Sequence, residues 1–214
     1  MKITTFSQVD TWVFDLDNTL YHPSVRLFDQ IEARMRRYIM DLLSVEEAEA
    51  DALRATYWRD HGTTLSGLMA HHKIDPMHFL FDVHDLDFSA LTPDAALAQA
   101  ISALPGRKIV FTNGDAHYAR RVLAGRGLAE VFEDVYGIEH AAFAPKPRQE
   151  AFDTVFSLAN VAPTRAAMFE DDVRNLMVPK ALGLGTVLVH GDRAGHGHID
   201  HDTQDLATFL TQIA

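Results

Sequence analysis

The stretch Trp12-Val13-Phe14-Asp15-Leu16-Asp17-Asn18-Thr19-Leu20 decides the fold that the rest of the sequence implies. It begins with apolar, β-prone residues and changes at Asp15 into a polar loop, which predicts a buried strand that ends there. Two carboxylates, Asp15 and Asp17, therefore stand at the exit of this strand. Carboxylate oxygens suit Mg²⁺, and an ionised carboxylate can also attack phosphorus. Asp and Asn are equally common in turns, so this stretch alone leaves both interpretations open.

The composition of the chain limits its partners. The 214 residues include 19 basic and 30 acidic side chains, for a net charge of -11. This charge disfavours nucleic-acid polymers and anionic membranes as partners, because binding them needs a basic face, although a small anionic substrate stays possible if the site holds a cation. Because cysteine is absent, disulfides and zinc–thiolate sites are excluded. No signal peptide or membrane-spanning run is visible, so we expect a cytoplasmic protein, either monomer or homodimer.

The segment from residue 21 to residue 91 carries almost no strand pattern. Phe28, Ile31 and Met35 recur at helical spacing and predict an amphipathic helix over 24–43. Ser44 with a glutamate three residues later is a capping box, which predicts a second helix to residue 60. A third helix around 65–69 and a fourth that starts at Asp75-Pro76 complete an all-helical block.

From residue 92 the pattern changes to alternating strands and helices. We expect strands at 108–111, within 131–138, at 166–170 and at 186–190, and helices at 92–104, 115–126, 149–158, 173–182 and 203–213. This alternation predicts a parallel sheet covered by helices on both faces. The expected architecture is α/β, with a Rossmann-like core domain formed by 1–20 and 92–214 and a helical cap domain over 21–91, inserted after the first strand.

Polar motifs follow the strands of this expected core. Thr112-Asn113-Gly114 comes directly after a strand, Lys146 stands between two prolines, and Glu170-Asp171-Asp172 follows another strand, with Asn175 one turn later. Each has an ordinary explanation as a turn, an exposed lysine or a helix cap. In an open parallel sheet, however, ligands bind beyond the carboxyl ends of the strands, so all of these groups should meet at one site.

In this order, the motifs resemble those of the haloacid dehalogenase superfamily of phosphohydrolases. Asp15-Leu16-Asp17-Asn18-Thr19 matches the first motif, Thr112 the second, Lys146 the third and Glu170-Asp171 the fourth. The resemblance covers essentially the whole chain, and the helical block looks like the cap of that family. A narrower resemblance to the pyrimidine 5'-nucleotidase branch lies in the cap and in the second motif, at Tyr57, Gly62-Thr63-Thr64-Leu65, Gly67-Leu68 and Phe111-Thr112-Asn113-Gly114-Asp115.

The resemblance implies Mg²⁺-dependent hydrolysis of a small phosphomonoester, such as a nucleoside 5'-monophosphate. Asp15 would form an aspartyl-phosphate and Asp17 would act as general acid and base. The metal would be held by Asp15, the backbone carbonyl of Asp17, Asp171 and, directly or through water, Glu170, with Asn175 orienting these ligands. Thr112, Asn113 and Lys146 would bind the phosphoryl oxygens. Relatives that cleave carbon–halogen bonds lack an acid at the position of Asp17, which argues against dehalogenation.

Substrate selectivity is expected from the cap. The residues considered for substrate contact are Tyr21, His22, Tyr57, Trp58, His61, Thr63 and Thr64, although aromatic residues at helical spacing are usually core, and Thr63-Thr64 could simply cap a helix. Three alternatives stay open: a phosphatase for another small phosphate such as a sugar phosphate or phosphoglycolate, a β-phosphoglucomutase-like phosphomutase, and a non-catalytic binding protein. The last has no need of Asp17 or Lys146. The histidines at 190, 196, 198 and 201 match no familiar metal-ligand spacing.

Overall fold

The computed structural model describes residues 6–213. Residues 1–5 and 214, which belong to the expected core domain, lie outside this range. Within it, the chain forms one six-stranded sheet in the order β3-β2-β1-β4-β5-β6, and all neighbouring strands are parallel. The strands are β1 (Thr11–Phe14), β2 (Arg107–Phe111), β3 (Asp134–Tyr136), β4 (Ala166–Glu170), β5 (Gly185–Val189) and β6 (His201–Thr203).

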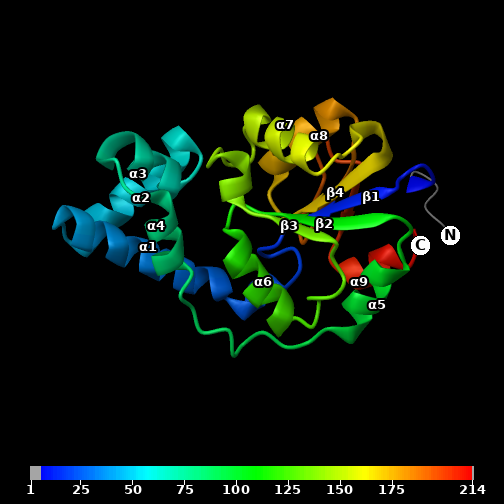
Figure 1. Cartoon of the computed structure of the whole chain (residues 1–214), viewed down its shortest axis with the longest axis horizontal. Coiled ribbons are helices and arrows are strands. Elements are labelled where there is room, and N and C mark those ends of the chain that lie inside the picture. Colours follow the sequence, from blue (N-terminus) through cyan, green and yellow to red (C-terminus); the bar gives the residue numbers. More distant parts are fainter. Residues whose placement is uncertain (1–5, 214) are drawn as a thin grey trace.

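Helices cover both faces of the sheet, as the alternation of strands and helices predicts. Along β1, Trp12 and Phe14 point into one apolar cluster and Val13 into another, because successive side chains of a strand face opposite ways. In Figure 1, α7 and α8 lie on one side of the sheet, and α5, α6 and α9 on the other. These helices are α5 (Ala95–Ala103), α6 (Ala116–Gly125), α7 (Gln149–Leu158), α8 (Met177–Leu182) and α9 (Leu206–Leu210).

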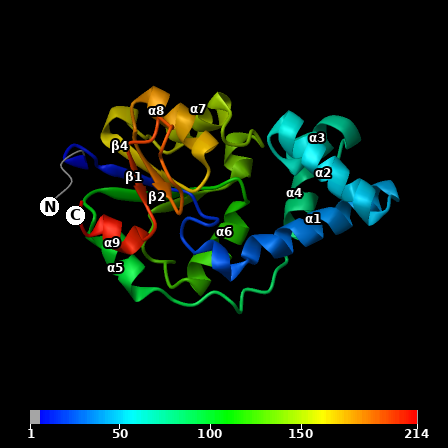
Figure 2. The same cartoon turned by 180° about the vertical axis from the view of Figure 1, so that it is seen from behind.

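The first four α-helices after β1 form a separate group, which we call the helical segment (residues 21–91). It comprises α1 (Leu27–Leu43), α2 (Glu47–His61), α3 (Thr64–His72) and α4 (Pro76–Val83). Many of its apolar side chains, among them Ile39, Leu68 and Phe79, form a cluster of their own, whereas Leu27 and Ile31 at the start of α1 pack into a cluster on the sheet. Figures 1 and 2 show this group beside one end of the sheet, with the start of α1 next to α6. No helix within residues 6–213 combines the length and apolar character needed to cross a bilayer.

Several predicted element boundaries were wrong for identifiable reasons. Ser44 does not cap the second helix; it adopts a left-handed conformation (φ 55°) that ends α1, and Glu46 precedes α2. The helix expected from residue 92 begins after Asp94, whose side chain accepts the backbone N–H of Leu97. The helix expected over 203–213 shortens to α9, because Thr203 ends the edge strand β6 and Asp205 caps the helix by accepting the Thr208 N–H. That strand is short and polar and shows no apolar alternation.

Candidate active site

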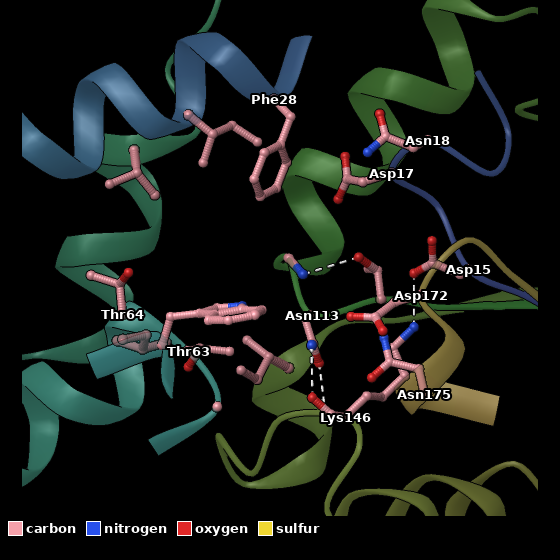
Figure 3. A pocket seen from close by; sticks show the side chains of 18 of the residues that line it. Asp15, Asp17, Asn18, Phe28, Thr63, Thr64, Asn113, Lys146, Asp172 and Asn175 are labelled. Carbon is pink, nitrogen blue, oxygen red and sulfur yellow. Dashed lines mark hydrogen bonds and ion pairs between the residues drawn. The ribbon is translucent and has the colours of Figure 1, made fainter. Parts of the chain in front are cut away.

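The exits of three neighbouring strands bring the polar motifs together. Because β1 lies between β2 and β4, Asp15, Thr112 and Asp171 all follow strands that end at the same edge of the sheet. The connection that carries Lys146 reaches the same edge. Figure 3 shows Asp15, Asn113, Lys146, Asp172 and Asn175 around one cavity, which also has the helical segment on its wall.

Lys146 is the charged centre of this site. Its side chain is 2% exposed, and its Nζ donates to Asp15 Oδ1 at 2.7 Å, to Glu170 Oε2 at 2.6 Å and to the backbone carbonyl of Phe111 at 2.9 Å. Burial alone would lower the pKa of the ammonium, but the carboxylates of Asp15 and Glu170 raise it above its usual value. Lys146 is therefore a permanent cation that offsets part of the acidic cluster.

Asn113 fixes the backbone of Lys146 rather than offering its side chain to a ligand. Its Nδ2 donates to the Lys146 carbonyl at 3.1 Å, and its Oδ1 accepts the Lys146 N–H at 2.8 Å (Figure 3). Thr112 is buried, and its hydroxyl accepts the backbone N–H of Gly114. Within residues 6–213, no protein acceptor pairs with the backbone N–H groups of Asp17 and Asn113. These groups can bind anionic oxygens.

Three carboxylates lie close enough to share one cation. Ligand oxygens of Asp15, Glu170 and Asp171 all lie within 4.8 Å of one another. Burial, and then the charge of Asp15, raises the pKa of both Glu170 and Asp171 above the usual range, because three crowded acids resist ionisation. Nearby, Asn175 Oδ1 is buried and lacks a hydrogen-bond partner in the described part of the chain. An all-oxygen set with an unpaired amide oxygen beside it fits a hard divalent cation.

Asp17 has a different environment from Asp15. Its Oδ1 accepts two hydrogen bonds, from the Tyr21 hydroxyl at 2.6 Å and from the Tyr118 hydroxyl at 2.5 Å. Burial and the neighbouring charge of Asp15 raise the pKa of the Asp17 carboxyl. By contrast, Asp15 Oδ2 accepts the Thr19 hydroxyl and its Oδ1 accepts Lys146. The two tyrosine hydrogen bonds oppose the rise in the pKa of Asp17, so burial and the charge of Asp15 outweigh them.

The cavity measures about 350 Å³ and has two unlike halves. The acids, Lys146 and the Thr112 loop form its polar half. The helical segment contributes an apolar wall, and Trp58 lies at its edge with an indole that is 51% exposed. The Arg174 guanidinium sits 4.2 Å from the centre of that ring and is held by the carboxylate of Asp172. The apolar lining residues from the helical segment are Phe28, Ile31, Met35, Leu65, Phe79, Leu80 and Val83.

Some of the candidates for substrate contact line the cavity and others do not. Thr63 and Thr64 line the cavity, and the Thr63 hydroxyl also caps α3 by accepting the Ser66 N–H. Three others are not part of the lining: Tyr57 packs in the apolar cluster of the helical segment, His61 pairs with His71, and His22 packs against His190. Tyr21 reaches the site only through Asp17.

Sequence reasoning missed several residues of the site. Tyr118 comes from α6, and no sequence motif marks it. His84 and Arg174 also line the cavity. Phe28, Ile31 and Met35 had a signal, because their helical spacing predicts an apolar face, but that spacing cannot show that the face borders a cavity. None of the histidines of the 190–201 loop belongs to the cavity lining. His198 Nε2 bonds to the Val173 carbonyl, and the His201 ring packs near Phe6.

Comparison with known proteins identifies the family. The model of the haloacid dehalogenase-like hydrolases matches residues 9–183, which is most of the chain. The chain belongs to this hydrolase family. Among curated proteins, the hydrolase is 25% identical over 192 residues to phosphate metabolism protein 8 of Saccharomyces cerevisiae. That match covers 82% of this chain and 60% of the length of the yeast protein.

Solved structures share the fold of this hydrolase. CbbY from Rhodobacter sphaeroides, solved in complex with phosphate, has a TM-score of 0.60 and 17% identity, covering 93% of this chain and 95% of that one. L-2-haloacid dehalogenase from Xanthobacter autotrophicus, solved with chloropropionic acid covalently bound, has a TM-score of 0.54 and 16% identity, covering 95% and 87%. At such identities the likeness establishes the α/β fold of the family and leaves the reaction to be argued from the site.

Proposed function

We propose that this hydrolase is a Mg²⁺-dependent phosphatase that acts on a small phosphomonoester. The observation that carries the proposal is the pair of unlike carboxylates: Asp15 is bound to a buried lysine, whereas burial and the neighbouring charge of Asp15 raise the pKa of the Asp17 carboxyl. A nucleophile must be ionised, whereas a general acid must carry a proton when the leaving group departs. The two environments supply these two states in one cavity.

In the proposed reaction, an Asp15 carboxylate oxygen attacks phosphorus, and the bond from phosphorus to the leaving oxygen breaks. Asp17 gives its proton to that oxygen, so an alcohol leaves and an aspartyl-phosphate forms. Asp17, now ionised, takes a proton from a water molecule that attacks the phosphorus. The bond from phosphorus to the Asp15 oxygen breaks, which releases phosphate and restores the Asp15 carboxylate. Lys146, the Thr112 hydroxyl and the free backbone N–H groups of Asp17 and Asn113 bind the phosphoryl oxygens.

The acidic cluster is the place for the cation. Asp15, Asp171 and the backbone carbonyl of Asp17 would hold Mg²⁺, with Glu170 near enough to bind it or a water on it. When bound, the cation would neutralise charge between the phosphate and Asp15. Asn175 would orient one of these ligands or a water beside them, since its buried Oδ1 has no protein partner among the described residues.

The apolar half of the cavity supports a substrate with a flat, weakly polar part. Phe28, Ile31 and Met35 offer a surface for a nucleobase, Trp58 offers an aromatic ring, and Thr63 and Thr64 offer hydroxyls. A cavity of about 350 Å³ is within the range of small-molecule sites. A nucleoside 5'-monophosphate of the pyrimidine type fits this division, with phosphate in the polar half and base under the helical segment. In this proposal the segment acts as the cap domain.

The experiment is a panel of phosphomonoesters, comprising uridine and cytidine monophosphates, ribose 5-phosphate, glucose phosphates and phosphoglycolate, assayed by phosphate release. We expect turnover with Mg²⁺, loss of turnover with a chelator, and the highest kcat/KM for the pyrimidine nucleotides. If the enzyme prefers a sugar phosphate or phosphoglycolate, that compound and not a nucleotide is its substrate. Phosphate release that occurs only in the presence of a sugar bisphosphate, as a side reaction of phosphoryl transfer, would indicate a phosphomutase. Absence of turnover on the whole panel would contradict the enzyme proposal.

A further inference from the structure

A second buried pair, His84 and Asp115, borders the cavity and has no part in the reaction as proposed. His84 follows α4, where the helical segment returns toward the sheet, and Asp115 precedes α6. His84 Nδ1 lies 2.5 Å from Asp115 Oδ2, and the two residues are 7% and 1% exposed. Burial opposes ionisation of Asp115, but the hydrogen bond with His84 keeps its pKa below the usual value. An ionised carboxylate only accepts, so Nδ1 carries the proton.

The orientation of the His84 ring is fixed from two further directions. Its face stacks on Tyr118, with ring centres 4.1 Å apart and planes 13° apart. Asp115 is itself held in place, because its Oδ1 accepts the Tyr118 N–H at 2.8 Å and caps α6. Gly114 leaves room for the Tyr118 ring, because a Cβ there would stand only 2.9 Å from Tyr118 Cδ1. The other ring nitrogen of His84, Nε2, therefore has a defined direction.

The Nε2 atom is available to a ligand. His84 lines the cavity, and within residues 6–213 no protein group forms a hydrogen bond with Nε2. Since Nε2 is not among the fully buried unpaired atoms of the described residues, it keeps some solvent-accessible surface. With Nδ1 bound to Asp115, a neutral ring presents Nε2 as an acceptor and a protonated ring presents it as a donor. A hydroxyl group can pair with either form.

The position of His84 indicates which part of a substrate it meets. In the proposed reaction the leaving oxygen departs on the side of phosphorus opposite Asp15, and Asp17 serves that oxygen. Tyr118 joins the two residues, since its hydroxyl binds Asp17 and its ring stacks on His84. The neighbours of His84 on the wall, Leu80 and Val83, are apolar and offer no hydrogen bond.

We propose that His84 Nε2 binds a hydroxyl group of the leaving alcohol, and that Asp115 is the positioning residue that aims the ring. The proposal rests on the phosphatase function proposed above and narrows its substrates to esters whose alcohol carries a second hydroxyl near the phosphate, as in the ribose of a nucleotide. His84 thereby becomes a specificity-determining residue placed at the junction between the helical segment and the sheet.

The test measures a ratio of kcat/KM values, uridine 5'-monophosphate against its 2',3'-dideoxy analogue, with Mg²⁺ present. The two substrates differ only in the hydroxyls. We expect the wild-type ratio to be about ten, the effect of one hydrogen bond to a buried polar group, and we expect His84→Asn to reduce it to about one. Asparagine can replace Nδ1 toward Asp115 but has no atom at Nε2. His84→Gln, which can place an amide near the Nε2 position, should keep part of the ratio.

Controls and outcomes separate the inference from the function on which it rests. His117→Asn changes an exposed histidine of α6 that is not part of the cavity lining, and should leave the ratio unchanged. Circular dichroism checks that each variant is folded. An equal loss on both substrates in His84→Asn, or a ratio that does not change, would overturn the role of His84. If ribose 5-phosphate is hydrolysed but nucleotides are not, the proposal of a nucleotide substrate is wrong. The role of His84 is then tested by the ratio of kcat/KM values for ribose 5-phosphate and phenyl phosphate. Inactivity on all of these esters would overturn both proposals.

Discussion

Replacing Lys146 by Met in the metal-free protein should lower the free energy of unfolding by about 3–5 kcal/mol, the usual cost of removing one partner from a buried ion pair. The side chain is 2% exposed and its ammonium binds two carboxylates, at 2.7 and 2.6 Å. Methionine fills similar space but leaves Asp15 and Glu170 buried without a cation. For a chain of this length, each 1 kcal/mol corresponds to about 2–4 °C, so Tm should fall by about 6–20 °C.

The pH dependence of this loss has a definite sign. Burial and the charge of Asp15 already raise the pKa of Glu170 in the folded protein, while Lys146 opposes that rise. Without Lys146 the pKa of Glu170 in the folded state rises further, so the folded state binds a proton more tightly than the unfolded state. Stability of the variant is then retained at low pH and lost as pH rises through the folded-state pKa. The difference in Tm from wild type should be larger at pH 8 than at pH 5.5.

The assay is thermal unfolding followed by circular dichroism, with a chelator present. Lys180→Met is the matched control, because Lys180 pairs with Asp200 but the two side chains are 36% and 26% exposed. Such partly exposed pairs contribute about 0–1 kcal/mol. A Lys146→Met protein that unfolds within about 2 °C of the Lys180→Met protein at pH 8 would refute the view that Lys146 balances the buried acids.

Other predictions concern catalysis. Asp15→Asn should remove phosphate release entirely, because an amide cannot form the acyl-phosphate; full turnover would end the covalent scheme. Asp17→Asn should slow both formation and hydrolysis of that intermediate by about 10²–10⁴-fold, measured in single-turnover experiments, and an unchanged rate in either step would remove its acid–base role. Trp58→Ala should raise KM for uridine monophosphate about fivefold or more, through lost stacking, while KM for ribose 5-phosphate stays constant. An equal rise for both would assign Trp58 a structural role with Arg174.

The fold was predictable because strand patterns and polar motifs coincide along the chain. Strand β4 and helix α7 have the bounds that the sequence predicts, since both are bordered by clear turn residues and contain continuous apolar patterns. Strand β6 was not predictable, because an edge strand of three polar residues is held by backbone pairing with β5 rather than by side-chain burial. The capping box at Ser44 failed for a local reason: the residue adopts a left-handed conformation to end α1.

The site was predictable where the sheet dictates it. Asp15, Thr112 and Asp171 follow strands that share one edge, so the topology alone brings them together. The cavity wall formed by the helical segment was not predictable, because helical spacing indicates an apolar face but does not show what that face contacts. Tyr57 illustrates this: it is aromatic and close in sequence to Trp58, yet it packs inside the helical segment while Trp58 borders the cavity.

The two halves of the cavity belong to different packing units. The apolar cluster of the helical segment is distinct from the two clusters that flank the sheet, and the reactive loops are tied to one another through Asn113 and Lys146. Exchanges at Leu65 or Phe79, which belong to the cluster of the helical segment, therefore alter the shape available to a ligand without disturbing the charge balance around Asp15. In evolutionary terms, such an arrangement lets lineages diversify the metabolites they consume while inheriting the chemistry intact. It also marks those positions as the natural starting library for redesigning the enzyme's preferences.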